Sequence, residues 1–214
     1  MNWNWGRFKR YIGTFFWATL VALGVRFFFV EDFRVFSDSM APTLLSGDLI
    51  FVAKSNFNLR LPFSSYELVK FRRPHRGEVV AFALPDHGLE TYVKRVVATE
   101  GDEVSIREGL LYVNGTRAGY SEGTEPSSHL RSESIDAGAP YPVVWDPKQI
   151  PNYGPVQVPQ GHFFVLGDNR VKSIDSRNWG PIPYSCLKGK VSLIWLSLGP
   201  DGLRRDRVGR WVRS

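Results

Sequence analysis

Two serines, Ser37 and Ser39, stand two residues apart in the stretch SDSMAPTLLSGDLI, directly after a very hydrophobic N-terminus. A serine hydroxyl at its ordinary pKa is a poor nucleophile and becomes reactive only beside a general base. The proline, glycine and aspartate that follow are typical of a polar turn, which is the ordinary interpretation of such a pair. A nucleophilic serine is therefore a useful hypothesis only if the rest of the chain supplies a base.

Lys94 is the main candidate for that base. In the run TYVKRVVA, strand alternation puts Lys94 on one face with Val96 and Ala98. Lysine is rarely buried without a partner or a task, although an edge lysine that discourages aggregation fits the same pattern. To act as a base the amine must be neutral, and burial lowers its pKa from about 10.4. The hypothesis therefore requires an apolar niche, no carboxylate in contact with Lys94, and an uncharged hydrogen-bonding neighbour.

A third polar cluster, GDNRVKSIDSRNWG, follows the apolar run FFVL. In this cluster Asp175 and Arg177 can pair and hold the loop, while Ser173 and Ser176 offer the uncharged hydroxyls that the amine requires. A polar surface loop with no catalytic role would have the same composition. The four histidines have no metal-binding spacing, and no recognisable motif gives His162 an acidic partner, so we predict no metal and no cofactor.

The elements that position these residues begin with the apolar run YIGTFFWATLVALGVRFFFV (11–30), whose single charge is Arg26. As a helix it spans about 30 Å, the thickness of a bilayer core, so we predict one membrane span. A buried core helix is the alternative, whereas a cleavable signal peptide would end in small residues that this run lacks. Basic residues precede the run and acidic residues follow it, which predicts a cytoplasmic N-terminus and an extracytoplasmic domain.

Beyond residue 31 the apolar pattern changes to short runs rich in β-branched and aromatic residues, which predict strands. These runs lie at 48–54, 78–84, 91–98, 103–108, 110–115, 162–169 and 190–198. Asn114 and Gly115 predict a type I′ hairpin turn. Because no helical period of comparable strength appears among the runs, we expect a mainly β architecture, either a barrel or packed sheets.

Two segments depart from this pattern. Residues 121–154 are rich in Ser, Gly, Pro and acidic residues, which predicts an inserted, loop-rich subdomain. The basic tail has five arginines, at 204, 205, 207, 210 and 213, and is either a solvated end or a strip that contacts lipid headgroups. The expected domains are the N-terminus and anchor at 1–31, the β core at 32–120 and 155–198, the insertion at 121–154, and the tail at 199–214.

The net charge indicates which partners the chain can have. Its 214 residues carry a formal charge of +6, which favours contact with anionic surfaces. No helix-turn-helix, zinc-finger or RNA-binding signature accompanies the charge, so the sequence favours a phospholipid membrane over nucleic acid. The one cysteine, Cys186, can form no internal disulfide and is interpreted as a small core residue.

The three clusters SDSMAPTLLSGDLI, YVKRVVATEGDEV and GDNRVKSIDSRNWG, in this order after an apolar N-terminal run, resemble the type I signal peptidases, or leader peptidases. With RGEVVAF and QGHFFVLGDN as flanks, the resemblance covers most of 34–54, 76–119 and 155–196. It implies a coiled, mostly β catalytic core with a less regular second domain. It also implies a serine endopeptidase that cuts signal peptides from exported preproteins after a small-x-small sequence.

The functional roles known in this family can be assigned to the residues of this sequence that match the family's motifs. The resemblance implies that Ser39 is the nucleophile and Lys94 the neutral general base of a Ser–Lys dyad that works through an acyl-enzyme. It further implies that Ser37 forms the oxyanion hole with the backbone N–H of Ser39, and that Ser173 orients the amine of Lys94. The structural support it implies consists of two ion pairs, Asp175 with Arg177 and Asp168 with Arg95.

The residues around the nucleophile complete the implied site. Met40 follows the nucleophile, and Pro42 fixes the turn that presents it. Phe36 stands where the family usually has proline, which is expected to alter backbone rigidity or substrate contact beside the oxyanion hole. The implied setting is the bacterial cytoplasmic membrane, crossed once, with the enzyme acting as a monomer on its outer side.

Three alternatives remain open at this point. Peptidases that mature conjugative pilins share the dyad and resemble signal peptidases closely. Self-cleaving repressors of the SOS response also share it, but they carry a DNA-binding domain where this chain has its apolar run. The non-enzymatic alternative is a membrane-tethered β-domain that binds partners, with its serines and lysine incidental.

Overall fold

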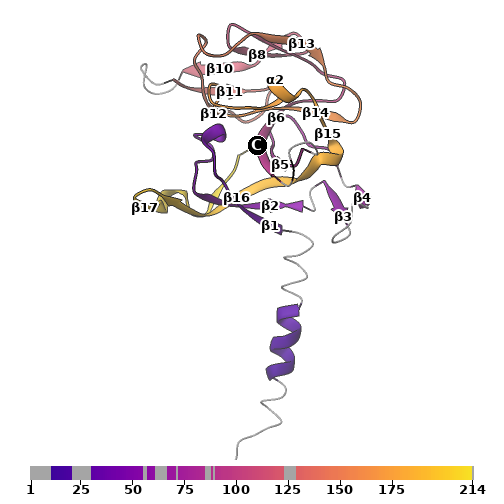
Figure 1. The fold of residues 1–214 in the computed structure, drawn as a ribbon, viewed down its shortest axis with the longest axis vertical. Helices are drawn as coiled ribbons and strands as arrows, with labels where there is room; N and C mark the ends of the chain where they lie inside the picture. The colour runs from indigo at the N-terminus through magenta and orange to yellow at the C-terminus, as the bar shows by residue number, and fades with distance from the viewer. Residues whose placement is uncertain are drawn as a thin grey trace, which may run out of the picture.

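The computed structural model describes residues 11–20, 30–54, 57–60, 67–70, 72–84, 88, 90–122 and 129–213. A helix covers 11–20, and a mainly β domain makes up the rest, as the sequence predicts (Figure 1). The membrane span predicted at 11–30 lies partly outside the described residues. Within the described residues, no helix has both the length and the apolar character needed to cross a membrane.

The largest sheet has nine strands and contains five of the seven predicted runs. Its order is β1 (Val30–Arg34), β2 (Asp48–Ala53), β16 (Leu187–Gly199), β5 (Val79–Phe82), β6 (Tyr92–Thr99), β14 (His162–Leu166) and β15 (Ile182–Pro183), with β17 (Gly202–Leu203) and β18 (Arg210–Trp211) paired to β16. The five runs lie in β2, β5, β6, β14 and β16, and the run at 162–169 is a strand only over its first five residues, which form β14. Register shifts along β16 and between β14 and β6 mark irregularities that bend the strands and let the sheet curl.

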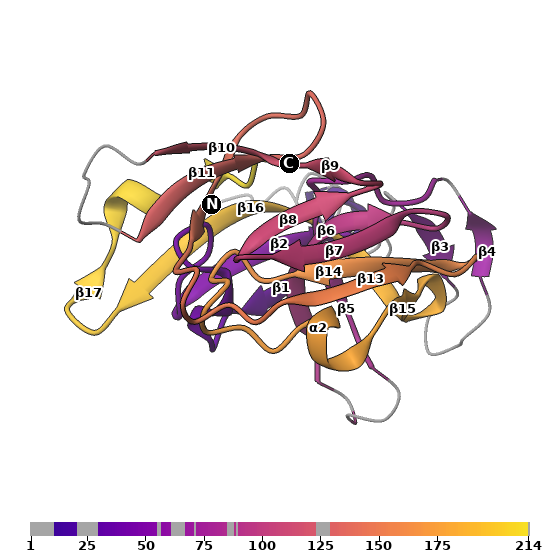
Figure 2. The same ribbon diagram turned by 90° about the horizontal axis from the view of Figure 1, so that it is seen from above.

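Smaller sheets complete the β domain (Figures 1 and 2). One is formed by β13 (Tyr153–Gln157), β7 (Glu103–Arg107), β8 (Leu110–Val113) and β9 (Thr116–Arg117), and another by β10 (Gly119–Glu122), β11 (Leu130–Ser134) and β12 (Tyr141–Val144). The strands β3 (Asn58–Arg60) and β4 (Glu67–Lys70) pair with each other. Between β8 and β9, Asn114 and Gly115 both have positive φ, which confirms the predicted hairpin turn.

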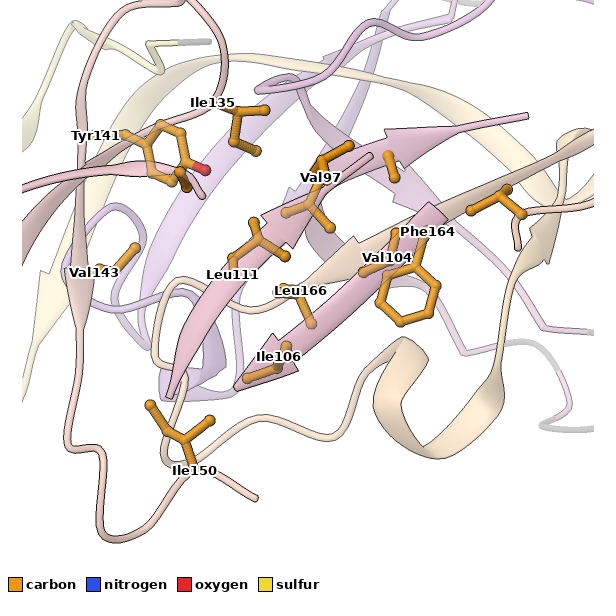
Figure 3. Close-up of a cluster of buried hydrophobic side chains, with 14 residues drawn as sticks. Val97, Val104, Ile106, Leu111, Ile135, Tyr141, Val143, Ile150, Phe164 and Leu166 are labelled. Carbon is orange, nitrogen blue, oxygen red and sulfur yellow. The ribbon is translucent and has the colours of Figure 1, made fainter. Parts of the chain in front are cut away.

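Side chains from both faces of β14 are buried, which explains why its sequence is a continuous apolar run. Phe164 and Leu166 face one hydrophobic cluster, and Phe163 and Val165 face another. Figure 3 shows the first cluster, in which the side chains of β14 meet those of β6, β7, β8 and β12. Strand β6 is buried over most of its length in the same way. A polar side chain that points inward from β6 is therefore removed from water.

Residues 121–154 differ from the loop-rich segment that the sequence predicts. Their described part contains most of the three-stranded sheet, and Ile135, Tyr141, Val143 and Ile150 belong to the first hydrophobic cluster. Only Tyr141 and Val143 have the two-residue spacing of a strand, and so short an alternation predicts little by itself. The one fully buried side chain of β11 is the carboxylate of Glu133, which no apolar pattern can reveal.

The basic tail is also more ordered than its composition suggests. It contains a one-turn 3-10 helix, η5 (Arg205–Arg207), and the strands β17 and β18. Arg207 is only 5% exposed and pairs with the fully buried Asp48, while Val212 packs into the hydrophobic cluster beneath β2 and β16. Arg207 and Val212 therefore belong to the core, and the remaining arginines of the tail lie at or near the surface.

Candidate active site

Ser39 lies in a one-turn 3-10 helix, η1 (Asp38–Met40), between β1 and β2. Met40 is 2% exposed and sits in the hydrophobic cluster beneath these strands, so its side chain anchors the turn from within. Phe36, by contrast, is 81% exposed just before the turn, and the peptide bond between Ala41 and Pro42 after it is cis. Ser39 itself is 9% exposed, at the boundary between core and surface.

The structure brings Ser39 and Lys94 together, although they are far apart in the sequence. Lys94 projects from β6, is 4% exposed, and places its Nζ 2.6 Å from Ser39 Oγ. Ser37 Oγ lies 3.0 Å from Ser39 Oγ on the other side. The nucleophile and base proposed from the sequence are thus in direct hydrogen-bonding contact, with a second hydroxyl beside them.

Burial controls the charge of the Lys94 amine. Loss of water around it lowers the pKa of Lys94 to about 8, even though the negative charges of Asp175 and Asp168 act to raise this pKa. Arg177 acts in the same direction as burial. Among the described residues no carboxylate forms an ion pair with Lys94, which is one of the conditions that the sequence hypothesis set. A substantial fraction of the amine is therefore neutral near pH 8.

The tight turn at residues 167–170, after β14, holds the backbone of the serine from the far side. The backbone N–H of Asn169 donates to the carbonyl oxygen of Ser39 at 3.0 Å, and Asn169 Nδ2 donates to the carbonyl oxygen of Asp38 at 3.2 Å. Gly167 lies so close that a Cβ in its place would overlap the side chain of Ser173 and the carbonyl oxygen of Ser39. Glycine at 167 is what allows the turn to approach the serine.

A first ion pair fixes this turn to β6. Arg95, next to Lys94 in the chain, donates through Nε and Nη2 to the two carboxylate oxygens of Asp168 at 2.8 and 2.7 Å, and both side chains are fully buried. Thr43, from the loop after Ser39, also donates to this carboxylate. The strand that carries Lys94 and the loop that carries Ser39 therefore converge on Asp168.

A second ion pair fixes the same turn to the short helix α2 (Ser176–Trp179). Asp175 caps this helix, accepts two side-chain hydrogen bonds from Arg177 at 2.8 and 2.9 Å, and accepts the backbone N–H of Gly167 at 2.9 Å. Burial raises the pKa of Asp175, but the hydrogen bonds and charge of Arg177, together with the hydrogen bond from the Gly167 N–H, hold the pKa below its usual value. Arg177 also donates to the carbonyl oxygen of Arg170.

Ser173 is the predicted site residue whose expected contact the structure does not contain. Its Oγ is buried and has no hydrogen-bond partner among the described residues, so it does not contact the Lys94 amine here. Ser176, the other hydroxyl of this cluster, accepts the backbone N–H of Val165. The orienting role of Ser173 stays a prediction.

Sequence reasoning missed the residues that hold the site through the backbone or from other sheets. Asn169 acts partly through its main-chain N–H, which every residue except proline has, so its type gives no signal. Glu133 and Arg170 form a buried ion pair, and Glu133 lay in the segment interpreted as an insertion. The described residues contain no group of three or more His, Cys, Asp or Glu side chains suited to a metal ion.

Comparison with known proteins adds an independent line of information. The family model described as signal peptidase, peptidase S26, matches residues 8–196. The signal peptidase I of Pseudomonas fluorescens is 33% identical, over 86% of this chain and 71% of that protein, and the signal peptidase I of Pseudomonas aeruginosa is 34% identical over the same shares. A crystal structure of a signal peptidase I from Enterococcus faecalis is 25% identical and has a TM-score of 0.37, covering 56% of this chain and 98% of that chain.

Replacing Gly167 with Ala is expected to destabilise the protein, because the added Cβ would collide with Ser173 and with the backbone of Ser39. Overpacking of a filled site costs about 1–3 kcal/mol, and denaturant unfolding should show a loss of this size for Gly167→Ala. Gly138→Ala is the matched control, since its Cβ would meet only the carbonyl oxygen of Ile135 at 3.0 Å. A Gly167→Ala variant as stable as the wild type would contradict the close approach.

Proposed function

Because the chain belongs to the peptidase S26 family of signal peptidases, serine endopeptidases that remove signal peptides, we propose that it cuts exported preproteins with Ser39 as nucleophile and Lys94 as general base. The observation that carries this assignment is the 2.6 Å contact between Ser39 Oγ and a buried amine that has no carboxylate in contact with it among the described residues. A lysine in an ion pair would stay protonated and could not accept a proton.

The reaction then proceeds in two halves. In the first, the neutral Lys94 amine accepts the hydroxyl proton of Ser39 as Ser39 Oγ attacks the scissile carbonyl carbon. The resulting ammonium group returns this proton to the leaving amine, which departs as the new N-terminus of the mature protein. In the second half Lys94 accepts a proton from water, the hydroxide attacks the acyl-enzyme, and the released Ser39 oxygen recovers its proton.

We assign stabilisation of the oxyanion to the backbone N–H of Ser39 and the hydroxyl of Ser37. The N–H groups of the first turn of a helix have no acceptor within that turn, so the N–H of Ser39 is available to a substrate oxygen. Ser37 Oγ, 3.0 Å from the nucleophilic oxygen, is near enough to reach the same oxyanion. Two preorganised donors at the point where charge develops lower the barrier more than they stabilise bound substrate.

The remaining site residues have supporting roles in this proposal. The Arg95–Asp168 and Asp175–Arg177 pairs fix the turn behind Ser39, and Ser173 orients the amine of Lys94. Pro42 shapes the loop after the nucleophile. Met40 contributes only backbone to the substrate side because its side chain is in the core, whereas the exposed Phe36 offers a surface to the substrate.

The substrate of this reaction is an extended segment with small residues before the cut, which binds by adding a strand beside the site. In our proposal the enzyme acts as a monomer at the outer side of a bacterial cytoplasmic membrane. The apolar run at 11–30 anchors it there, and the β core at 32–120 and 155–198 carries the chemistry. The charge asymmetry around the run supports this orientation.

Removing either member of the dyad is expected to abolish activity while the fold persists. Ser39→Ala eliminates the nucleophile and Lys94→Ala the base, and each should lower kcat at least about 10³-fold in cleavage of a purified preprotein. Circular dichroism would confirm that both variants are folded. Ser121→Ala and Lys172→Ala, at exposed positions, are the matched controls and should keep wild-type rates. Substantial turnover by either dyad variant would dismiss the assignment.

The pH dependence of kcat/KM should follow the charge of Lys94. Because only the neutral amine is a base, activity should rise with pH through a pKa of about 8 and fall tenfold per pH unit well below it. Asp175→Asn should shift this limb to lower pH, since it removes a negative charge that raises the pKa of Lys94 and frees Arg177, which lowers it. A profile with no titration below pH 10, or a shift to higher pH in Asp175→Asn, would contradict the mechanism.

The proposed orientation in the membrane can be tested in cells. A periplasmic reporter enzyme, fused after the C-terminal residue of the full chain, should be active because the catalytic domain is exported. The same reporter fused before residue 1 serves as the control and should be inactive. An inactive C-terminal fusion together with an active N-terminal fusion would contradict the proposed orientation.

A further inference from the structure

The carboxylate of Glu133 is fully buried away from the dyad, and each of its oxygens accepts two hydrogen bonds. Its two carboxylate oxygens accept Arg170 Nη1 and Nη2 at 2.6 and 2.5 Å, and each oxygen also accepts one tyrosine hydroxyl, from Tyr120 at 2.6 Å and Tyr141 at 2.5 Å. Glu133 is 0% and Arg170 3% exposed. Each carboxylate oxygen thus has two donors, and the carboxylate is fixed in position.

Arg170 transmits this fixed position to the turn that holds the serine. Its Nε donates to the carbonyl oxygen of Gly167 at 3.0 Å, so the guanidinium group bridges the first and last residues of the turn at residues 167–170. The residue before it is Asn169, whose N–H holds the carbonyl oxygen of Ser39. Glu133 is therefore linked to the Ser39 backbone through Arg170 and the backbone of the turn.

A second route links Glu133 to the strand of the base. The ring of Tyr141 lies under the guanidinium group of Arg95, with 3.8 Å between the guanidinium carbon and the ring centroid. Arg95 adjoins Lys94 on β6 and pairs with Asp168, which precedes Asn169. The contacts from Glu133 through Arg170 and the turn, and those through Tyr141 and Arg95, both end at Asp168 and form a closed ring.

Stability alone is a poor explanation for such a pair. Replacing a buried ion pair with apolar side chains of similar volume is often neutral or stabilising, because burying two charges is costly. A charged pair fixes distance and direction in a way that apolar packing does not. The closed ring joins the three-stranded sheet to the turn behind Ser39 and to the strand of Lys94, and none of the hydrogen bonds of the described residues runs from the ring to Ser39 Oγ or Lys94 Nζ.

We propose that Glu133 is a positioning residue for the peptidase reaction, which clamps Arg170 and thereby fixes the turn at residues 167–170 against the Ser39 backbone. The three-stranded sheet is then part of the machinery that aligns the dyad and not an accessory to it. This inference rests on the proposed function in taking Ser39 as the nucleophile.

The first test is the variant Glu133→Gln, which keeps the shape and leaves Arg170 without its counter-charge. Small displacements of reacting groups cost up to about 10²-fold in rate, so kcat for preprotein cleavage should fall roughly 30- to 100-fold. KM should stay within about threefold, since Glu133 is remote from the substrate surface. The control is Asp102→Asn, which breaks a partly buried pair with Arg76 away from the turn and should leave kcat unchanged.

A double variant separates positioning from stability. Glu133→Met with Arg170→Met removes both charges and should regain thermal stability relative to Glu133→Gln, but without the clamp its kcat should remain low. Tyr141→Phe, which retains the ring under Arg95 and loses one hydrogen bond to Glu133, should fold normally and lower kcat severalfold. It keeps the test decisive if the Glu133 variants fail to fold.

Two results would overturn the proposal. One is a folded Glu133→Gln or Tyr141→Phe variant with wild-type kcat, and the other is recovery of activity together with stability in the double variant. Acylation of Ser39 by a p-nitrophenyl ester, followed by nitrophenolate release and by mass spectrometry, is measured in parallel. A wild-type enzyme that reacts with the ester and cuts no preprotein would contradict the proposed function, while the ester rates would still decide the role of Glu133.

Discussion

The structure depends on keeping one amine out of water without giving it a counter-ion. The Lys94 amine is shielded from water because β6 lies within the domain and is covered on both faces. Ser39 reaches the amine from a turn that is anchored by the buried side chain of Met40. Burial lowers the pKa of Lys94 by disfavouring its charged form, and a single carboxylate in contact would reverse this effect. The rest of the site therefore has to supply rigidity while withholding acidic groups from the amine.

Rigidity comes from elements that are distant in the sequence. The Ser39 carbonyl is held by Asn169, the turn around Asn169 is held by Asp175 on one side and Arg170 on the other, and Asp168 ties the turn to β6. The tail contributes as well, because Arg207 donates to the carbonyl oxygen of Thr43 in the loop after Ser39. Four separate parts of the chain thus determine the position of one serine.

The sequence predicts those parts of this arrangement that have a local or motif signal. Strands such as β2, β6 and β14 were predictable because their apolar runs reflect burial in the core, and Ser39 and Lys94 because they lie in distinctive motifs. Strand β11 was not predictable, because its buried side chain is a carboxylate whose partner, Arg170, is distant in the sequence. Asn169 contributes partly through main-chain atoms, and Arg207 is indistinguishable by composition from the exposed arginines beside it. Such contacts depend on the tertiary structure.

The use of arginine around the lysine follows from the chemistry of the two side chains. Arginine keeps its charge under all ordinary conditions and presents a planar set of donors that matches a carboxylate, so it can neutralise an acid permanently. Asp168 and Asp175, the two carboxylates whose charges raise the pKa of Lys94, are both paired with arginines, as are the buried Glu133 and Asp48. These pairs offset the acidic charges near the site while retaining their hydrogen bonds to the backbone. Among the described residues around Ser39, Lys94 is the cation that can lose its proton, because its pKa responds to burial.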